Sequence, residues 1–147
     1  GKRVMFYLLT GARPAEMRTV AEIKKGFVHL VGTKTKHADR WIKLSESAMT
    51  LFENEPVEFY RFDLKRFRQR LQKFVEQHCE IKSYVTLYTL RHTFATNLYY
   101  LGCPDKERAA YMGHTTTKTT NDFYTSLDPT ISAIDIKNIY GDFYPEF

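Results

Sequence analysis

Residues 26–44, GFVHLVGTKTKHADRWIKL, contain two short runs rich in β-branched, aromatic and other apolar residues, joined by a mostly polar stretch. The first run covers residues 26–31 and the second residues 40–44, and both have a composition typical of strands. The linking residues 32–39 begin with Gly32 and continue with polar side chains, which favours a hairpin turn. The sequence therefore predicts one small antiparallel sheet in this part of the chain.

Outside the hairpin, the sequence has the patterns of helices. Residues 4–9 indicate the end of a helix that stops at Gly11, and Pro14 suits the first turn of a second helix running to about Glu22. Later helices are predicted over residues 45–54, 59–79, 89–101, 105–112 and about 119–126. The predicted fold class is therefore mainly α with a small antiparallel β-hairpin or sheet, an α+β fold.

Length and composition are those of one ordinary domain. The chain has 147 residues, of which 43% are hydrophobic and 27% are charged, and no apolar run is long enough to span a membrane. Cys79 and Cys103 stand far apart and have no metal-ligand or redox spacing. We therefore expect reduced thiols in a cytoplasmic protein. Because the chain begins at Gly1, inside an apparent helix, we expect it to be a fragment of a longer protein.

Positive charge is concentrated in the first half of the chain. Residues 1–73 hold 16 Lys and Arg against 8 Asp and Glu, whereas residues 74–147 hold 6 against 9. The overall net charge is +5 and the pI is about 9.2, which is compatible with a polyanionic partner. The first half is the part of the chain expected to face it.

Two arginines stand out because each is placed near the start of a predicted helix. Arg13 lies in T-G-A-R-P-A-E, and Arg91 lies in Y-T-L-R-H-T-F-A-T. A guanidinium can hold two phosphate oxygens and keeps its proton, and the free N–H groups of a helix start also favour an anion. The structural alternative is that each arginine forms a salt bridge, in the case of Arg13 with Glu16.

Four sequence segments taken together identify a protein family more specifically than either arginine does alone. T-G-A-R-P-A-E, V-G-T-K-T-K, Y-T-L-R-H-T-F-A-T and M-G-H-T-T-T-K-T-T-N-D-F-Y-T follow one another along the chain. In this order and at these separations, the chain resembles the tyrosine recombinase/phage integrase family over residues 10–127. The resemblance implies the catalytic domain of an enzyme that cuts and rejoins DNA through a 3′-phosphotyrosine intermediate.

The resemblance implies a role for each matching residue. Arg13 and Arg91 match the two arginines that clamp the scissile phosphate, and Glu16 matches the acid that supports the first of them. His114 matches a histidine that donates a hydrogen bond to the phosphate. Tyr124, ten residues beyond it, matches the nucleophile.

The resemblance also implies a general acid, and the matching residue is in the predicted hairpin turn. Lys34 matches the lysine that protonates the departing 5′ oxygen, and Lys36 is its rival for this role. One position departs from the family pattern: Tyr88 stands three residues before Arg91, where the family usually has histidine. A phenol can hydrogen-bond to the phosphate or to Tyr124, but it is a poor base at neutral pH. The departure leaves open which group accepts the nucleophile's proton.

A cluster of basic residues follows the hairpin. Arg61, Lys65 and Arg68 are predicted to share one face of the helix over residues 59–79, beside its apolar stripe. A solvated surface is the structural alternative. Next to a phosphate-cutting site, we expect these three residues, together with Lys36, to contact double-stranded DNA.

Residues 1–129 are predicted to form the catalytic domain, truncated at its N-terminal side. The acidic segment 130–147, rich in Ile, Tyr and Phe, either packs on its own molecule or docks on a neighbouring protomer. The family resemblance implies docking in trans within a tetramer bound to DNA.

The expected activity needs neither a metal nor a nucleotide cofactor, because the covalent intermediate conserves the energy of the phosphodiester bond. The sequence has no carboxylate cluster with metal-ligand spacing, which argues against a two-metal nuclease. Two alternatives stay open. One is a DNA-binding homologue with impaired catalysis, and the other is an activity like that of type IB topoisomerases.

Overall fold

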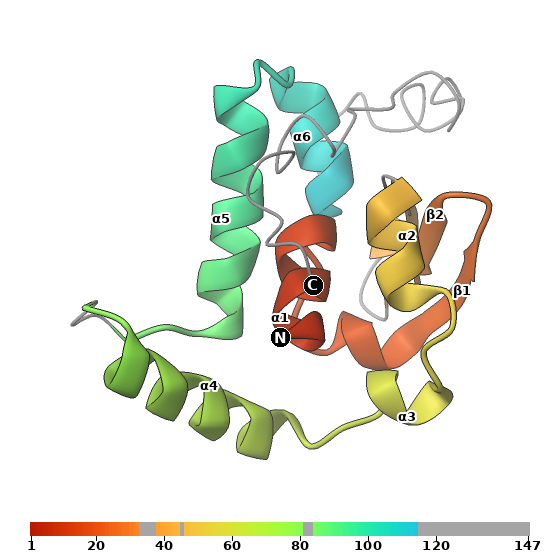
Figure 1. Ribbon diagram of the computed structural model, residues 1–147. Helices are drawn as coiled ribbons and strands as arrows, with labels where there is room; N and C mark the ends of the chain where they lie inside the picture. Colours follow the sequence, from red (N-terminus) through yellow and green to blue (C-terminus); the bar gives the residue numbers. More distant parts are fainter. Residues whose placement is uncertain (33–37, 45, 81–83, 115–147) are drawn as a thin grey trace.

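The computed structural model describes residues 1–32, 38–44, 46–80 and 84–114. Within them, the elements in chain order are α1 Lys2–Thr10, the 3-10 helix η1 Glu16–Thr19, β1 Val20–Lys24, β2 Phe27–Leu30, β3 Arg40–Lys43, α2 Glu46–Phe52, α3 Val57–Tyr60, α4 Leu64–His78, α5 Leu87–Tyr100 and α6 Asp105–Met112. The helices lie beside a small three-stranded sheet, whose strands β1 and β2 are at one edge of the molecule in Figure 1. The predicted fold class, mainly α with a small antiparallel sheet, is confirmed.

The sheet is an antiparallel meander in the order β1-β2-β3. Strands β2 and β3 are the predicted hairpin, and Val28 pairs with Ile42 while Leu30 pairs with Arg40. These four residues are buried, so one face of the sheet covers the core. The predicted turn between the two strands, with Lys34 and Lys36, lies largely outside the described residues.

Strand β1 corrects the prediction of a helix from Pro14 to about Glu22. Only the single turn η1 is helical there, and the chain then enters the sheet, where it pairs with β2 through a tight turn. Lys25 and Gly26 both have positive φ, 49° and 83°, as a two-residue type I′ hairpin turn requires. Pairing with β2 outweighs the helix propensity of the Ala, Glu and Lys residues in this stretch.

The long basic helix also begins later than predicted. Residues 57–60 form the separate helix α3, and α4 starts at Leu64, because the side chain of Asp63 accepts hydrogen bonds from the backbone N–H groups of Lys65 and Arg66. Arg61 therefore precedes α4 and does not share its face with Lys65 and Arg68.

The core joins the sheet to the helices. Its largest fully buried side chains include Phe6 and Tyr7 of α1, Phe52 of α2 and Leu87 of α5. Helix α5 lies alongside both α1 and α6 (Figure 1), and Phe94, Leu98, Cys103 and Met112 form a second small cluster where α5 meets α6. Across the described residues, no helix combines the length and the apolar character that crossing a membrane requires.

Helix α1 ends at Gly11, which has a left-handed φ of 59° and whose N–H donates to the carbonyl of Tyr7. A Cβ placed on Gly11 would lie 2.3 Å from Cδ1 of Phe94, which is fully buried in α5. The glycine therefore serves both the backbone turn and the close approach of α1 to α5.

Replacing Gly11 by alanine is expected to lower the free energy of unfolding by about 3 kcal/mol, because the left-handed backbone and the collision with Phe94 both add strain. Gly102→Ala is the matched control, since Gly102 also has positive φ, 75°, but open space around its Cα. It should cost only about 1 kcal/mol. Urea unfolding of both variants measures the difference, and equal losses would show that the Phe94 contact carries no weight.

Candidate functional site

The turn between α1 and η1 holds Arg13 at one edge of the core. The hydroxyl of Tyr7 donates to the carbonyl of Pro14 at 2.8 Å, and this bond ties the turn to α1. Glu16, the first residue of η1, accepts from the backbone N–H of Arg13 at 2.7 Å and from its Nη1 at 2.7 Å. The predicted contact between Glu16 and the first arginine is therefore present. About a third of the Arg13 side chain, 32%, is exposed.

Arg91 reaches the same edge from α5. It is the fifth residue of α5, whereas the predicted helix from residue 89 made it the third, so the predicted help from a helix start does not apply to it. Arg13 likewise precedes a helix of only four residues. The guanidinium of Arg91 is buried and donates to the carbonyls of Gly11 and Met112, and its Nη2 lies 3.3 Å from Nε2 of His114.

The C-terminal end of α6 is shaped by Gly113, as the M-G-H segment requires. Gly113 has a left-handed φ of 60°, its N–H donates to Ala110 and the N–H of His114 donates to Ala109. This pair of bonds is a Schellman motif. It turns the chain at the end of the helix and places His114 beside Arg91.

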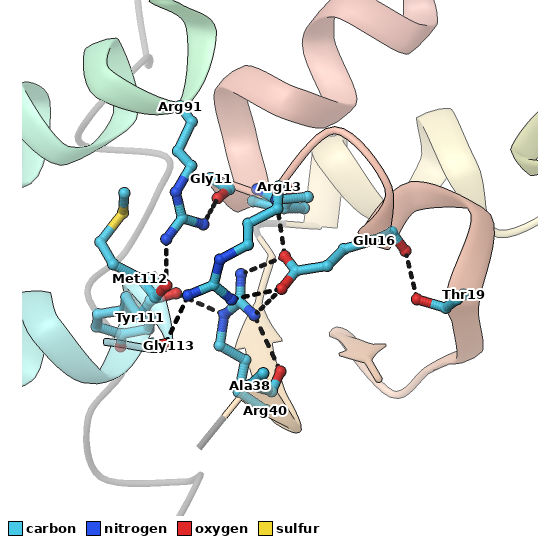
Figure 2. A network of polar contacts seen from close by, with 12 residues as sticks. Gly11, Arg13, Glu16, Thr19, Ala38, Arg40, Arg91, Tyr111, Met112 and Gly113 are labelled. Atoms are coloured by element: carbon cyan, nitrogen blue, oxygen red, sulfur yellow. Dashed lines mark hydrogen bonds and ion pairs between the residues drawn. The ribbon is translucent and has the colours of Figure 1, made fainter. Parts of the chain in front are cut away.

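The three carbonyls that end α6 each accept a hydrogen bond from a different arginine. Arg40 donates to Tyr111 at 2.7 Å, Arg91 donates to Met112, and Arg13 donates to Gly113 at 2.8 Å (Figure 2). The C-terminal end of a helix carries partial negative charge, so it offsets part of the repulsion between the three guanidinium groups.

Arg40 is a residue of this cluster that sequence reasoning missed. Its guanidinium donates to both carboxylate oxygens of Glu16, at 3.1 and 2.9 Å, and to the carbonyl of Ala38 at 3.1 Å. Figure 2 shows it beside Arg13, with Glu16 reaching both. The sequence pattern could have indicated its burial. Arg40 and Ile42 are two residues apart in a strand, so their side chains point to the same face of the sheet, and this face is buried.

The cluster has a strong excess of positive charge, since three guanidinium groups face one carboxylate. Burial tends to raise the pKa of Glu16, but the hydrogen bonds and charge of Arg40, together with the hydrogen bonds from Arg13, lower it below its usual value. Burial, then the charges of Arg40 and Arg13, lowers the pKa of Arg91 to about 10. Even so, both arginine and glutamate are ionised at neutral pH. The cluster therefore keeps a net positive charge at neutral pH.

Several predicted site residues lie elsewhere or outside the described part of the chain. Tyr88 is on the first turn of α5, one turn before Arg91, and 54% of it is exposed. Lys65 and Arg68 are exposed on α4, and Arg61 is exposed before it. Lys34, Lys36 and Tyr124 lie outside the described residues, so the structure does not place them near the arginines. No three His, Cys, Asp or Glu side chains in the described segments converge so that they could hold a metal ion.

His114 is expected to respond to an anion at this site. Burial, followed by the positive charges of Arg91, Arg13, Arg40 and His92, lowers its pKa below the ordinary value of 6.5. Because the folded-state pKa is the lower one, the unfolded chain binds more protons between the two values. The contribution of His114 to stability is therefore complete above about pH 6.5 and is lost as the pH falls below it.

An NMR titration of the imidazole, assigned with a His114→Gln variant, tests this expectation. Without an anion, the midpoint should lie below 6.5. Saturating inorganic sulfate should raise it, because the dianion stabilises the imidazolium. A midpoint that sulfate does not move would mean that no anion binds beside His114.

Comparison with known proteins gives three findings. Residues 3–130 match the sequence model of the phage integrase family. A search of curated proteins found no match to the sequence. Among solved structures, the chain is similar to the XerA recombinase, with 18% identity, a TM-score of 0.64, and coverage of 99% of this chain and 57% of that one. It is also similar to the Tn1549 transposon integrase in complex with transposon right end DNA, with 19% identity, a TM-score of 0.59, and coverage of 84% and 53%. The chain thus spans little more than half the length of either structure.

Proposed function

Because this chain belongs to the phage integrase family, we propose that residues 1–129 form the catalytic domain of a site-specific DNA recombinase or integrase. In this proposal the domain breaks a DNA strand through a covalent 3′-phosphotyrosine bond, and it rejoins strands by the reverse reaction. It uses neither a metal ion nor a nucleotide. The reaction takes place in the cytoplasm, on double-stranded DNA.

The observation that carries this proposal is the convergence of Arg13, Arg91 and His114. Arg13 and Arg91 donate to the adjacent carbonyls of Gly113 and Met112, although Arg13 and Gly113 are 100 residues apart in sequence. Nη2 of Arg91 lies 3.3 Å from Nε2 of His114. A guanidinium has five N–H groups, and the bonds of Arg13 to Glu16 and Gly113 use two of them within the described part of the chain. Donors therefore remain for a phosphate.

These residues suit the charge that develops during phosphoryl transfer. In the proposed step, the Tyr124 oxygen attacks the phosphorus and releases its proton to solvent, the bond from phosphorus to the 5′ oxygen breaks, and Lys34 protonates that oxygen. Arg13, Arg91 and His114 stabilise the negative charge on the non-bridging oxygens. Tyr88 assists by a hydrogen bond to the phosphate or to the nucleophile. Attack by a 5′ hydroxyl reverses each bond change and restores the phosphodiester.

The proposed DNA contacts include Lys65 and Arg68 of α4, with Arg61 before it and Lys36 in the hairpin. Lys65 and Arg68 are both exposed and lie three residues apart on α4, so they share one face of the helix.

Replacing Lys65 and Arg68 together by alanine should weaken binding to all DNA sequences and reduce the slope of log K against log salt by about 1.8, since each lost phosphate contact contributes about 0.9. Arg66→Ala/Arg70→Ala is the matched control: it removes the same charge, but from the other side of the apolar stripe of α4. Binding measured by fluorescence anisotropy at several salt concentrations compares the two. Equal slopes in the two variants would argue for a general charge effect and against contacts on this face.

We also propose that the protein self-associates into a tetramer on DNA, with segment 130–147 docking on a neighbouring protomer. Sedimentation of DNA complexes with and without residues 130–147 tests this arrangement. Loss of the tetramer on truncation supports docking in trans, and an unchanged tetramer contradicts it.

The covalent step can be tested although the DNA site is not defined. A pool of duplexes with randomised sequence and a nick near a fixed position is incubated with the protein, and complexes that survive SDS are recovered and sequenced. The nick lets the short fragment leave, so a covalent intermediate accumulates. Recovery of a common sequence supports the recombinase. DNA binding without any adduct would indicate a catalytically impaired homologue, and relaxation of supercoiled plasmid without strand exchange would indicate an activity like that of type IB topoisomerases.

A further inference from the structure

We propose that Arg40 is a positioning residue for the phosphate site, and this inference rests on the proposed function. In this role Arg40 does not touch the DNA. It holds Glu16 and the end of α6 in place, so that Arg13, Arg91 and His114 converge on one anion.

The hydrogen bonds of Arg40 leave it little capacity to bind a phosphate. Its side chain is only 3% exposed. Four of its five N–H groups donate within the protein, two to Glu16, one to Ala38 and one to Tyr111. By contrast, Arg13 is partly exposed and keeps donors available. The two arginines beside Glu16 therefore have different tasks.

Glu16 connects these two arginines through both of its carboxylate oxygens. Oε1 accepts from Nη1 of Arg13 at 2.7 Å and from Nη1 of Arg40 at 3.1 Å. Oε2 accepts from the backbone N–H of Arg13 at 2.7 Å and from Nη2 of Arg40 at 2.9 Å. Without Arg40, the buried carboxylate would lose half of these bonds. Arg13 would then no longer have a fixed support.

Arg40 also ties the sheet to the helix that presents His114. Its Nε donates to the carbonyl of Tyr111 at 2.7 Å, next to the carbonyls that Arg91 and Arg13 use. Arg40 itself is fixed in β3 by its pairing with Leu30. The position of His114 relative to Arg13 therefore depends on a bond that starts in the sheet. Residues that orient ligand-binding groups in this way typically change activity 10- to 100-fold when they are removed, as a rough guide from metal sites.

The test compares Arg40→Met, Arg40→Lys and wild type on a nicked duplex recovered from the randomised pool, at saturating protein and below each variant's melting temperature. We expect Arg40→Met to slow covalent adduct formation by roughly 10- to 100-fold while the Kd for DNA changes less than about threefold. Arg40→Lys should recover part of the rate, since an ammonium can reach Glu16 but cannot reproduce the planar set of bonds. Arg3→Met is the control, because Arg3 also donates to a backbone carbonyl, that of Phe59, away from the cluster.

A second variant and a second readout separate the outcomes. The double variant Arg40→Met/Glu16→Gln should form the covalent adduct hardly more slowly than Glu16→Gln alone, because both substitutions remove the same support of Arg13. By NMR, the Nη–H signals of Arg13 should be resolved in wild type and averaged by rotation in Arg40→Met, with no DNA present. If the folded Arg40→Met variant reacts within twofold of wild type and keeps the resolved signals, the positioning role is wrong and the recombinase proposal stands. If wild type forms no adduct, the recombinase proposal fails and the Arg13 signals alone decide the role of Arg40.

Discussion

Replacing Arg13 by alanine is expected to slow covalent adduct formation by roughly 100- to 1000-fold, the usual loss for one donor that faces developing oxyanion charge. The fold should survive, because Arg13 is partly exposed and Glu16 keeps Arg40 as a partner. Arg13→Lys should recover little of the rate, since an ammonium cannot hold two phosphate oxygens in the way a guanidinium does. Single-turnover cleavage of a nicked duplex at saturating protein measures the effect on chemistry apart from binding.

Arg18→Ala provides the matched control for Arg13→Ala. Arg18 is an exposed arginine on η1, in the same short segment, and its removal changes the net charge equally. Its adduct rate should stay within about threefold of wild type, since surface substitutions away from special features have small effects. If Arg13→Ala and Arg18→Ala lose activity equally, Arg13 is not a phosphate clamp and the site has been misassigned.

Replacing Tyr124 by phenylalanine is expected to abolish the covalent adduct altogether, because the change removes the attacking oxygen and nothing else. DNA binding should remain, so the variant should still shift the nicked duplex in a native gel. Tyr99→Phe is the control, since Tyr99 is exposed at the far end of α5, beside Arg108, and should react like wild type. An adduct formed by Tyr124→Phe would mean that another residue is the nucleophile.

Tyr88→Phe gives an intermediate case. The phenol of Tyr88 is exposed, one helical turn before Arg91, and we propose only an assisting hydrogen bond for it. Its loss should therefore reduce the rate by much less than the loss of Tyr124.

The parts of the fold that follow local patterns were predictable from sequence. The hairpin of β2 and β3, the end of α1 at Gly11 and the helix from residue 105 to residue 112 all have strong periodicity or a glycine at the required place. The prediction of β1 as part of a helix was wrong, because Ala21, Glu22 and Lys24 favour helices and only the pairing with β2 decides their conformation.

Site residues that belong to a sequence motif could be predicted from the sequence. Residues whose role depends on contacts with distant segments could be predicted less well. The motifs directed attention to Arg13, Glu16, Arg91 and His114, which the fold brings to one cluster. Arg40 belongs to none of the motif positions considered, and the partner that compensates its buried charge, Glu16, comes from a distant segment of the chain. Helix α5 likewise begins at Leu87, two residues before the predicted start, because its N-cap Thr86 forms a capping box with Thr89, and this places Arg91 further from the helix start.

The most direct test of the central claim is to locate the covalent bond. The SDS-resistant complex is digested with nuclease and trypsin, and the peptides are analysed by mass spectrometry. Tyr124 is the one tyrosine in the tryptic peptide 119–137. We predict a nucleotide joined to Tyr124 through its 3′ phosphate, and a free 5′ hydroxyl on the released DNA end. Attachment to another residue, a bond to a 5′ phosphate, or cleavage without any protein–DNA bond would contradict the proposed function.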